Sequence, residues 1–62
     1  MKSIVLDVEA ALTRHGRASH RLVQILRDIQ AQQTWLSRDT LSLVAQALHL
    51  PLAHVEGVAG FY

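Results

Sequence analysis

The hydrophobic residues of this chain recur every three or four positions in four stretches, which are separated by glycine, proline or polar residues. This spacing places the apolar side chains of each stretch on one face of an α-helix. Three stretches are long and the fourth is short. We therefore predict an all-α fold, a small and roughly orthogonal bundle of three helices plus a short fourth helix. The predicted helices cover residues 3–14, 19–33, about 37–50 and 51–56.

The same spacing predicts which side chains form the core. All of the predicted core side chains are aliphatic, and the core of so short a chain is expected to be small. The predicted core positions are Ile4, Val5, Val8, Ala11, Leu12, Leu22, Ile25, Leu26, Ile29, Leu41, Val44, Ala45, Leu48, Leu52 and Val55.

Residues at the ends of the stretches suit helix termini. Ser3, Ser19 and Ser37 each precede a stretch, where a serine hydroxyl can accept a hydrogen bond from a free backbone N–H group. Gly16 follows the first stretch and Gly57 follows the start of the fourth, and glycine commonly ends a helix. We expect the first helix to stop at Gly16 and the fourth to stop at Gly57.

Composition narrows the class of protein. The chain has 62 residues, half of them hydrophobic, which indicates one small folded domain rather than a disordered segment. It has no cysteine, so this stretch contains no disulfide, no thiolate metal site and no ligand set for an iron–sulfur cluster. Glycine and proline are few, which favours helices joined by short turns.

Net charge and hydropathy exclude fewer classes of protein than composition does. The formal net charge is +1 and the isoelectric point is about 8.4, whereas duplex-DNA binders commonly exceed about 9. No apolar run is long enough for a membrane span, and Asp7 interrupts the first apolar residues too early for a signal peptide. We expect a soluble cytoplasmic protein.

The four histidines are the candidate nitrogen ligands for a metal. His15 and His20 are five positions apart, as are His49 and His54. A helical metal pair needs a spacing of four, and a step of five turns the second side chain ~140° away from the first. We predict surface or cap histidines and no metal site.

Two further combinations could suggest catalysis. Asp28 and Asp39 are a possible carboxylate pair, and Ser19 with His20 a possible nucleophile and base. Adjacent helical side chains do not face each other, and nothing in the spacing places the two carboxylates in one cleft. A chain this small also lacks room for a pocket of about 300 Å³ or more. We expect no catalytic residue in this stretch.

The arginines near the first turn allow two interpretations. Arg14, Arg17 and Arg21 could be helix caps and ion-pair partners, or they could contact DNA in a helix-turn-helix module. A recognition helix needs several polar side chains aimed at base edges. The third predicted helix offers only Arg38, Thr40, Ser42 and Gln46. DNA binding remains the alternative hypothesis.

Interdomain or partner contacts are predicted at the second turn and at the end of the chain. Gln30 and Trp35 flank the second turn, where the indole can cover the junction of two helices. The last six residues combine two glycines with two aromatic side chains, which is typical of an interface. We therefore expect the polypeptide to continue beyond them. The predicted contact residues are Gln30, Trp35, Gly57, Val58, Phe61 and Tyr62.

Three segments together resemble a known family. They are LVQILRDIQ at 22–30, WLS at 35–37 and LVAQALHLPLAHVEGVAGFY at 43–62. They are similar to the N-terminal helical domain of the thioredoxin-like 2Fe-2S subunit of NADH dehydrogenase (respiratory complex I), over residues 12–62. The most specific part is 55–62, which resembles Val-x-Gly-Val-Ala-(Thr/Ser)-Phe-Tyr. The chain departs from the family at Thr34, where glycine is usual, and at Gly60, where threonine or serine is usual.

The resemblance implies a role in a larger protein. The same module occurs in NAD-dependent formate dehydrogenases and in NAD- or NADP-reducing hydrogenases. In this family the four cluster cysteines lie in the thioredoxin-like domain that follows, while FMN and NAD(H) are bound by a partner subunit or domain. Residues 1–62 would then be a single helical domain with no catalytic, cofactor-binding or metal-binding residue. Its expected role is structural and interfacial, in the diaphorase module of an NAD(P)H-linked oxidoreductase. An interaction domain of an unrelated assembly is a third interpretation.

Overall fold

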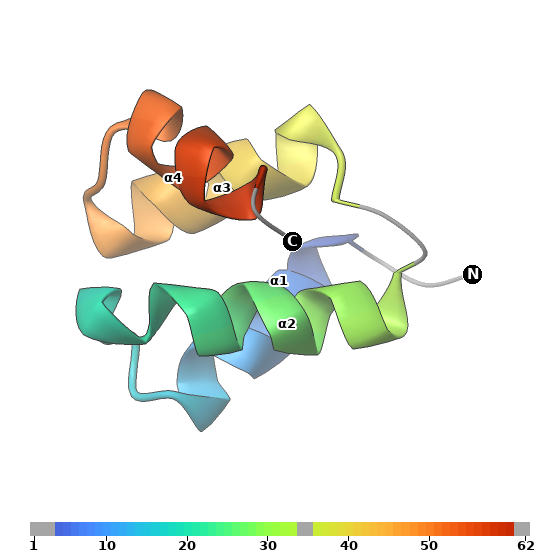
Figure 1. Ribbon diagram of the computed structural model, residues 1–62. Helices are drawn as coiled ribbons and strands as arrows, with labels where there is room; N and C mark the ends of the chain where they lie inside the picture. The colour runs from blue at the N-terminus through green and yellow to red at the C-terminus, as the bar shows by residue number, and fades with distance from the viewer. Residues whose placement is uncertain (1–3, 34–35, 61–62) are drawn as a thin grey trace.

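The computed structural model describes residues 4–33 and 36–60, which form a small bundle of α-helices (Figure 1). Within these residues the elements are α1 Ile4–Arg14, the 3-10 turn η1 Ser19–Arg21, α2 Leu22–Gln32, α3 Arg38–Leu48 and α4 Leu52–Ala59. The described part of the chain contains no strand, so the predicted all-α class is confirmed. No helix in these two ranges is long and apolar enough to cross a bilayer.

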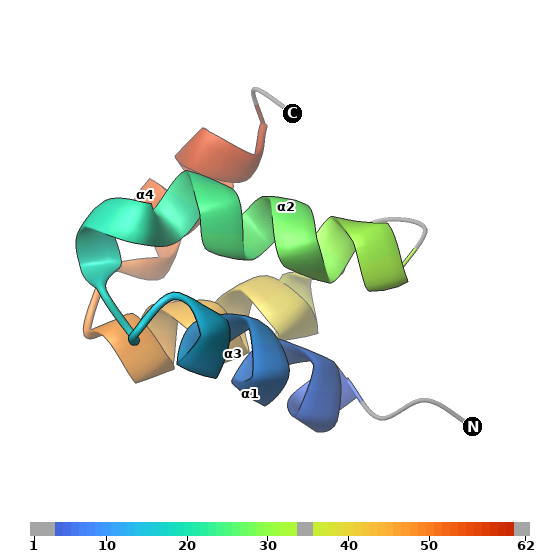
Figure 2. The same cartoon turned by 90° about the horizontal axis from the view of Figure 1, so that it is seen from below.

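The helices are arranged as two pairs. Figure 1 shows α1 with α2 in one layer and α3 with α4 in the other. Helix α1 packs against α2 and α3, and α4 packs against α3 and α2. The view from below in Figure 2 shows α1 and α3 side by side, which agrees with that contact. Each helix therefore has neighbours in its own layer and in the other layer.

The core is aliphatic and receives side chains from all four α-helices. Its buried hydrophobic residues are Val8, Ala11, Leu12, Leu22, Ile25, Leu26, Ile29, Leu41, Val44, Ala45, Leu48 and Val55. All twelve were predicted from the spacing. Leu52 was predicted to point inward as well, and it is half-buried and packs against this core.

The first turn of α1 differs from the prediction. Ile4 and Val5 were expected in the core, but they are 41% and 54% exposed, so this part of the prediction is wrong. Helical spacing gives the direction of a side chain, but it does not show whether a neighbouring helix extends far enough to cover it. The buried face of α1 begins only at Val8.

The first helix ends as predicted, at the turn that contains Gly16. Gly16 has a φ of +65° and Arg17 a φ of +53°, and both lie in the left-handed region. The Arg17 amide donates a hydrogen bond back to the Leu12 carbonyl over 2.8 Å, which closes the end of α1. Glycine suits the first of these positions because it has no Cβ atom to clash.

The predicted serine caps have different outcomes. Ser37 is the N-cap of α3, and its hydroxyl accepts a hydrogen bond from the Thr40 amide over 3.1 Å, as predicted. Ser19 is not a cap, so that prediction is wrong. It lies inside η1, where the Arg21 amide donates to the Ala18 carbonyl and thereby satisfies the turn without a side chain. Ser3 lies outside the described residues.

The third helix ends two residues earlier than predicted. It stops at Leu48, because His49 adopts the left-handed conformation with a φ of +57°. The Leu50 amide then donates to the Ala45 carbonyl over 2.9 Å, a Schellman-type end. Pro51 follows as the N-cap residue of α4 rather than as a residue of its first turn.

Gly57 does not end the fourth helix, and this prediction is wrong. Helix α4 continues through Gly57 to Ala59. The reason is packing, because Val58 and Ala59 are half-buried against the core. A glycine inside a helix costs only about 1 kcal/mol, which the burial of following apolar side chains can offset.

Candidate functional site

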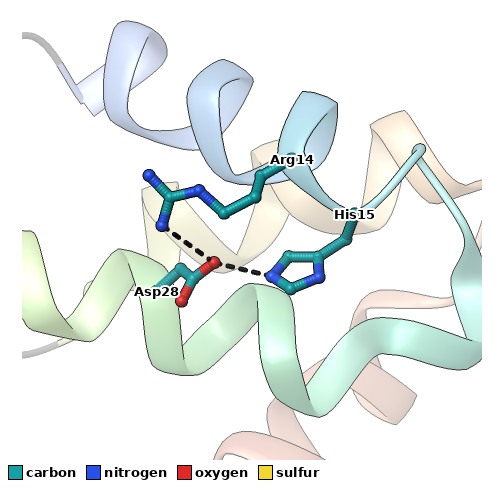
Figure 3. Close-up of polar contacts among 3 residues, drawn as sticks. All are labelled: Arg14, His15 and Asp28. Atoms are coloured by element: carbon teal, nitrogen blue, oxygen red, sulfur yellow. Dashed lines mark hydrogen bonds and ion pairs between the residues drawn. The ribbon is translucent and has the colours of Figure 1, made fainter.

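The best-defined polar cluster of the bundle joins the end of α1 to the middle of α2. His15 Nε2 lies 2.6 Å from Asp28 Oδ2, and Arg14 Nη1 lies 3.3 Å from the same oxygen (Figure 3). Because a carboxylate can only accept hydrogen bonds, the imidazole nitrogen is the donor. The His15 side chain is 17% exposed and that of Asp28 28%, so the contact is shielded in part from water.

An open hollow lies beside this cluster, between α1 and α2. Its volume is about 260 Å³, below the range of typical ligand pockets. It is lined by Asp7, Ala10, Ala11, Arg14, Asp28 and Gln32. Its two carboxylates already have partners, since Asp28 binds Arg14 and His15, and Asp7 accepts a hydrogen bond of 3.4 Å from Gln33. The arrangement ties two helices together, and it offers no nucleophile with an adjacent base.

The other carboxylate and the Ser19–His20 pair lie elsewhere. Asp39 is exposed in the first turn of α3, on a different helix from Asp28, and it does not line the hollow. Ser19 and His20 are exposed neighbours in η1. The structure therefore does not bring together the residues that sequence reasoning considered for catalysis.

The histidines occupy four separate environments. His20 and His54 are exposed, and His49 is the C-cap residue of α3, so the prediction of surface or cap histidines is confirmed for these three. It is wrong for His15, which is half-buried against Asp28. Among the residues that the structure describes, no group of three or more His, Cys, Asp or Glu side chains is placed to hold a metal ion.

The pairing of His15 with Asp28 was missed from the sequence. The two residues are 13 positions apart and belong to different segments of the bundle. Only the packing of α1 on α2 brings them together, and no local spacing carries that information. A histidine or arginine at the end of one predicted helix and a carboxylate on the next would be the signal to look for.

The arginines near the first turn form ion pairs. Arg14 pairs with Asp28, and Arg17 with Glu9. The interpretation of these two residues as ion-pair partners is confirmed. Arg21 is the N-cap residue of α2, without a side-chain cap bond.

The surface of α3 does not favour the helix-turn-helix alternative. Arg38 is exposed, and its Nε atom lies 3.9 Å from Oε2 of Glu56 on α4, so the guanidinium group has an ion-pair partner within the bundle. Thr40 is fully buried and Ser42 half-buried. Gln46 is the remaining exposed residue of the four that were considered for base contacts. A helix that reads bases needs more exposed polar side chains than this.

The three predicted contact residues that the structure describes lie on α2 and α4. Gln30 is half-buried on α2. On α4, Gly57 is exposed with open space around its Cα, and Val58 is half-buried against the core. The predicted contacts at Trp35, Phe61 and Tyr62 fall outside the described residues.

Taken together, the described residues build a packed helical domain in which polar side chains tie helices to one another. A sequence model of the thioredoxin-like 2Fe-2S ferredoxin family matches residues 8–62. This chain therefore belongs to the thioredoxin-like 2Fe-2S ferredoxin family. No solved structure matches the chain.

The cluster that gives the family its name does not fit the residues present. A 2Fe-2S centre is held by four side-chain ligands, which are cysteine thiolates or, in one variant, two cysteines and two histidines. The sequence contains no cysteine. The family name therefore implies a 2Fe-2S cluster, whereas residues 1–62 provide no thiolate to bind one.

Proposed function

We propose that this chain is the helical docking domain of an electron-transfer subunit, and that a thioredoxin-like domain after residue 62 holds the 2Fe-2S cluster. The observation that carries this proposal is the contrast between the family match and the cysteine-free sequence. The family match runs through residue 62, yet the sequence has no cysteine to bind the family's cluster. The role left to residues 1–62 is to position the domain that does bind it.

The geometry of α4 supports this role. Val55 at its centre is fully buried, so the helix is anchored in the bundle. Its outer surface at Gly57 is exposed, and a Cβ atom there would meet nothing within 4 Å. A rigid helix with an open face gives a following domain a fixed support. The proposed contacts are Gln30, Trp35, Gly57, Val58, Phe61 and Tyr62.

The proposed setting is the diaphorase module of an NAD(P)H-linked oxidoreductase in the cytoplasm. The sequence resemblance supports NADH dehydrogenase, formate dehydrogenase or hydrogenase as the parent complex. In each, FMN and NAD(H) would be bound by a partner subunit or domain. The residues of this stretch would make and break no bonds, and would instead fix the position of the electron-transfer domain beside that partner.

The coding sequence beyond codon 62 provides the test. We expect it to encode two pairs of closely spaced cysteines, and the longer protein to show the absorption and the electron paramagnetic resonance signal of a reduced 2Fe-2S cluster. A matched preparation of residues 1–62 should show neither signal. Absence of the cysteine pairs, or a longer protein that binds no cluster after reconstitution, would contradict the proposal.

A further inference from the structure

We infer that the helical bundle reaches its native structure without the iron–sulfur cluster of its family. The starting point is the mismatch between family and sequence, because the chain belongs to a cluster-binding family but has no cysteine. Small metal-binding domains are often unfolded until the metal binds. The contacts of this bundle point to the opposite behaviour.

The core is closed by the chain's own helices. Leu12 of α1, Ile25 and Ile29 of α2, Val44 of α3 and Val55 of α4 are each 0% exposed. Every α-helix thus places at least one side chain in the shared interior, and they form one cluster. No helix depends on an outside group for its central apolar contact.

Buried polar atoms are also satisfied within the bundle. Thr40 is fully buried, and its hydroxyl lies 2.9 Å from Ser37 Oγ and donates to Gln33 Oε1 over 3.3 Å. Within residues 4–33 and 36–60, no buried side-chain nitrogen or oxygen lacks a hydrogen-bond partner. A site shaped around a missing ligand would be expected to leave such atoms unpaired.

Three helix termini, the ends of α1 and α3 and the start of α3, are closed by residues of the segments next to them. The Arg17 amide bonds the Leu12 carbonyl after α1, the Leu50 amide bonds the Ala45 carbonyl after α3, and Ser37 caps the start of α3. These contacts satisfy backbone groups that would otherwise need water or an external partner. The connections after α1 and after α3 therefore have their own local hydrogen bonds and need no bound cofactor.

A bundle that folds without the cluster affects how the longer protein would assemble. A bundle of this kind stays folded before the cluster is inserted and after it is lost, so its docking does not depend on cluster occupancy. The independence of docking from cluster occupancy rests on the proposed function, whereas the folding of the 62-residue chain can be tested without it. A failure of the proposed function would leave the folding result unchanged.

The test is thermal unfolding of the 62-residue chain, followed by far-ultraviolet circular dichroism. One sample contains a strong chelator, and the other has been incubated anaerobically with ferrous iron and sulfide. We expect a cooperative transition in both samples, with midpoints within about 2 °C of each other. No visible absorption band should remain after the reconstituted sample is desalted. A chain that unfolds cooperatively only in the iron-treated sample, or in neither, would overturn the inference.

A pair of variants shows that the transition reports the packed bundle. Val55→Ala removes a buried side chain of α4, whereas Gln46→Ala changes an exposed residue of α3. We expect the first to lower the midpoint clearly and the second to leave it nearly unchanged. Equal midpoints for the two variants would mean that the signal comes from isolated helices, and would also overturn the inference.

Discussion

The two halves of the bundle, α1 with α2 and α3 with α4, are held together by different kinds of contact. In the first half, Asp28 binds both Arg14 and His15 in a partly shielded cluster. In the second half, Arg38 Nε lies 3.9 Å from Glu56 Oε2, and this longer ion pair is exposed to solvent. The α3–α4 pair therefore relies on apolar burial, whereas the α1–α2 pair adds a polar connection.

The connection between α1 and α2 also differs from the connection between α3 and α4. The chain passes from α1 to α2 through two left-handed residues and a 3-10 turn. It passes from α3 to α4 through the left-handed His49, the half-buried Leu50 and Pro51. The α1–α2 connection lies beside a charged contact between the two helices, whereas the α3–α4 connection places Leu50 against the core.

The largest predicted effect is common to both halves, because they share one core. Leu26→Ala in α2 and Leu48→Ala in α3 each remove a side chain that is more than 90% buried. Each should cost about 2–5 kcal/mol, which is comparable to the whole stability of so small a domain. Both variants should lose the cooperative transition in a thermal melt. A variant that keeps the wild-type midpoint would show that its leucine contributes little to the core.

The second prediction separates the halves. Asp28→Asn removes the charge that binds Arg14 and His15, and should lower the free energy of unfolding by about 1–2 kcal/mol. Asp39→Asn is the comparison in the second half, where the exposed carboxylate at the start of α3 should contribute only about 0.3–1 kcal/mol through the helix dipole. Chemical denaturation of both variants measures the difference, which should shrink in high salt as charges are screened. Equal stability of the two variants would remove the proposed distinction between the halves.

The third prediction compares the serines that precede α2 and α3. Ser37→Ala removes the hydroxyl that caps α3 and should cost about 1 kcal/mol. Ser19→Ala should change stability little, because Ser19 makes no cap bond in its 3-10 turn. Denaturant midpoints of the two variants provide the measurement. A larger loss for Ser19→Ala than for Ser37→Ala would contradict the assigned helix starts.

The smallest effects concern one glycine from each half, and they have opposite signs. Gly57→Ala should stabilise the chain by about 0.5–1 kcal/mol, because Gly57 is inside α4 and a Cβ atom there meets nothing within 4 Å. Gly16→Ala should destabilise it by about 1 kcal/mol, because its φ is +65°. Thermal melts of both variants check the signs. Destabilisation by Gly57→Ala would indicate that α4 ends at Gly57 after all.

Sequence reasoning succeeded where the physical signal is local. The spacing of Leu22, Ile25 and Ile29 predicted a buried face of α2, and Ser37 predicted the start of α3, because each signal lies within a few residues. The pairing of His15 with Asp28 could not be predicted in this way, since it depends on how two helices pack.

Two errors have the same origin. The helical stripe predicted that Ile4 was buried, and glycine chemistry predicted that α4 stopped at Gly57. Both predictions used local rules where tertiary packing decides the outcome. No neighbouring helix covers Ile4 fully, whereas the core does receive Val58 beyond the glycine. The proposed contacts at the second turn and at the end of the chain depend even more on partners, and remain predictions.

We propose that this bundle fixes the position of an electron-transfer domain beside a flavin- and NAD-binding partner, and binding to that partner can be measured. The most direct measurement is isothermal titration of the 62-residue chain into the flavin- and NAD-binding subunit from the same organism, with random duplex DNA as the second titrant. We predict saturable binding to the subunit and none to DNA at low salt. No binding to the subunit, together with DNA binding that weakens steeply as salt rises, would contradict the account and favour the nucleic-acid alternative.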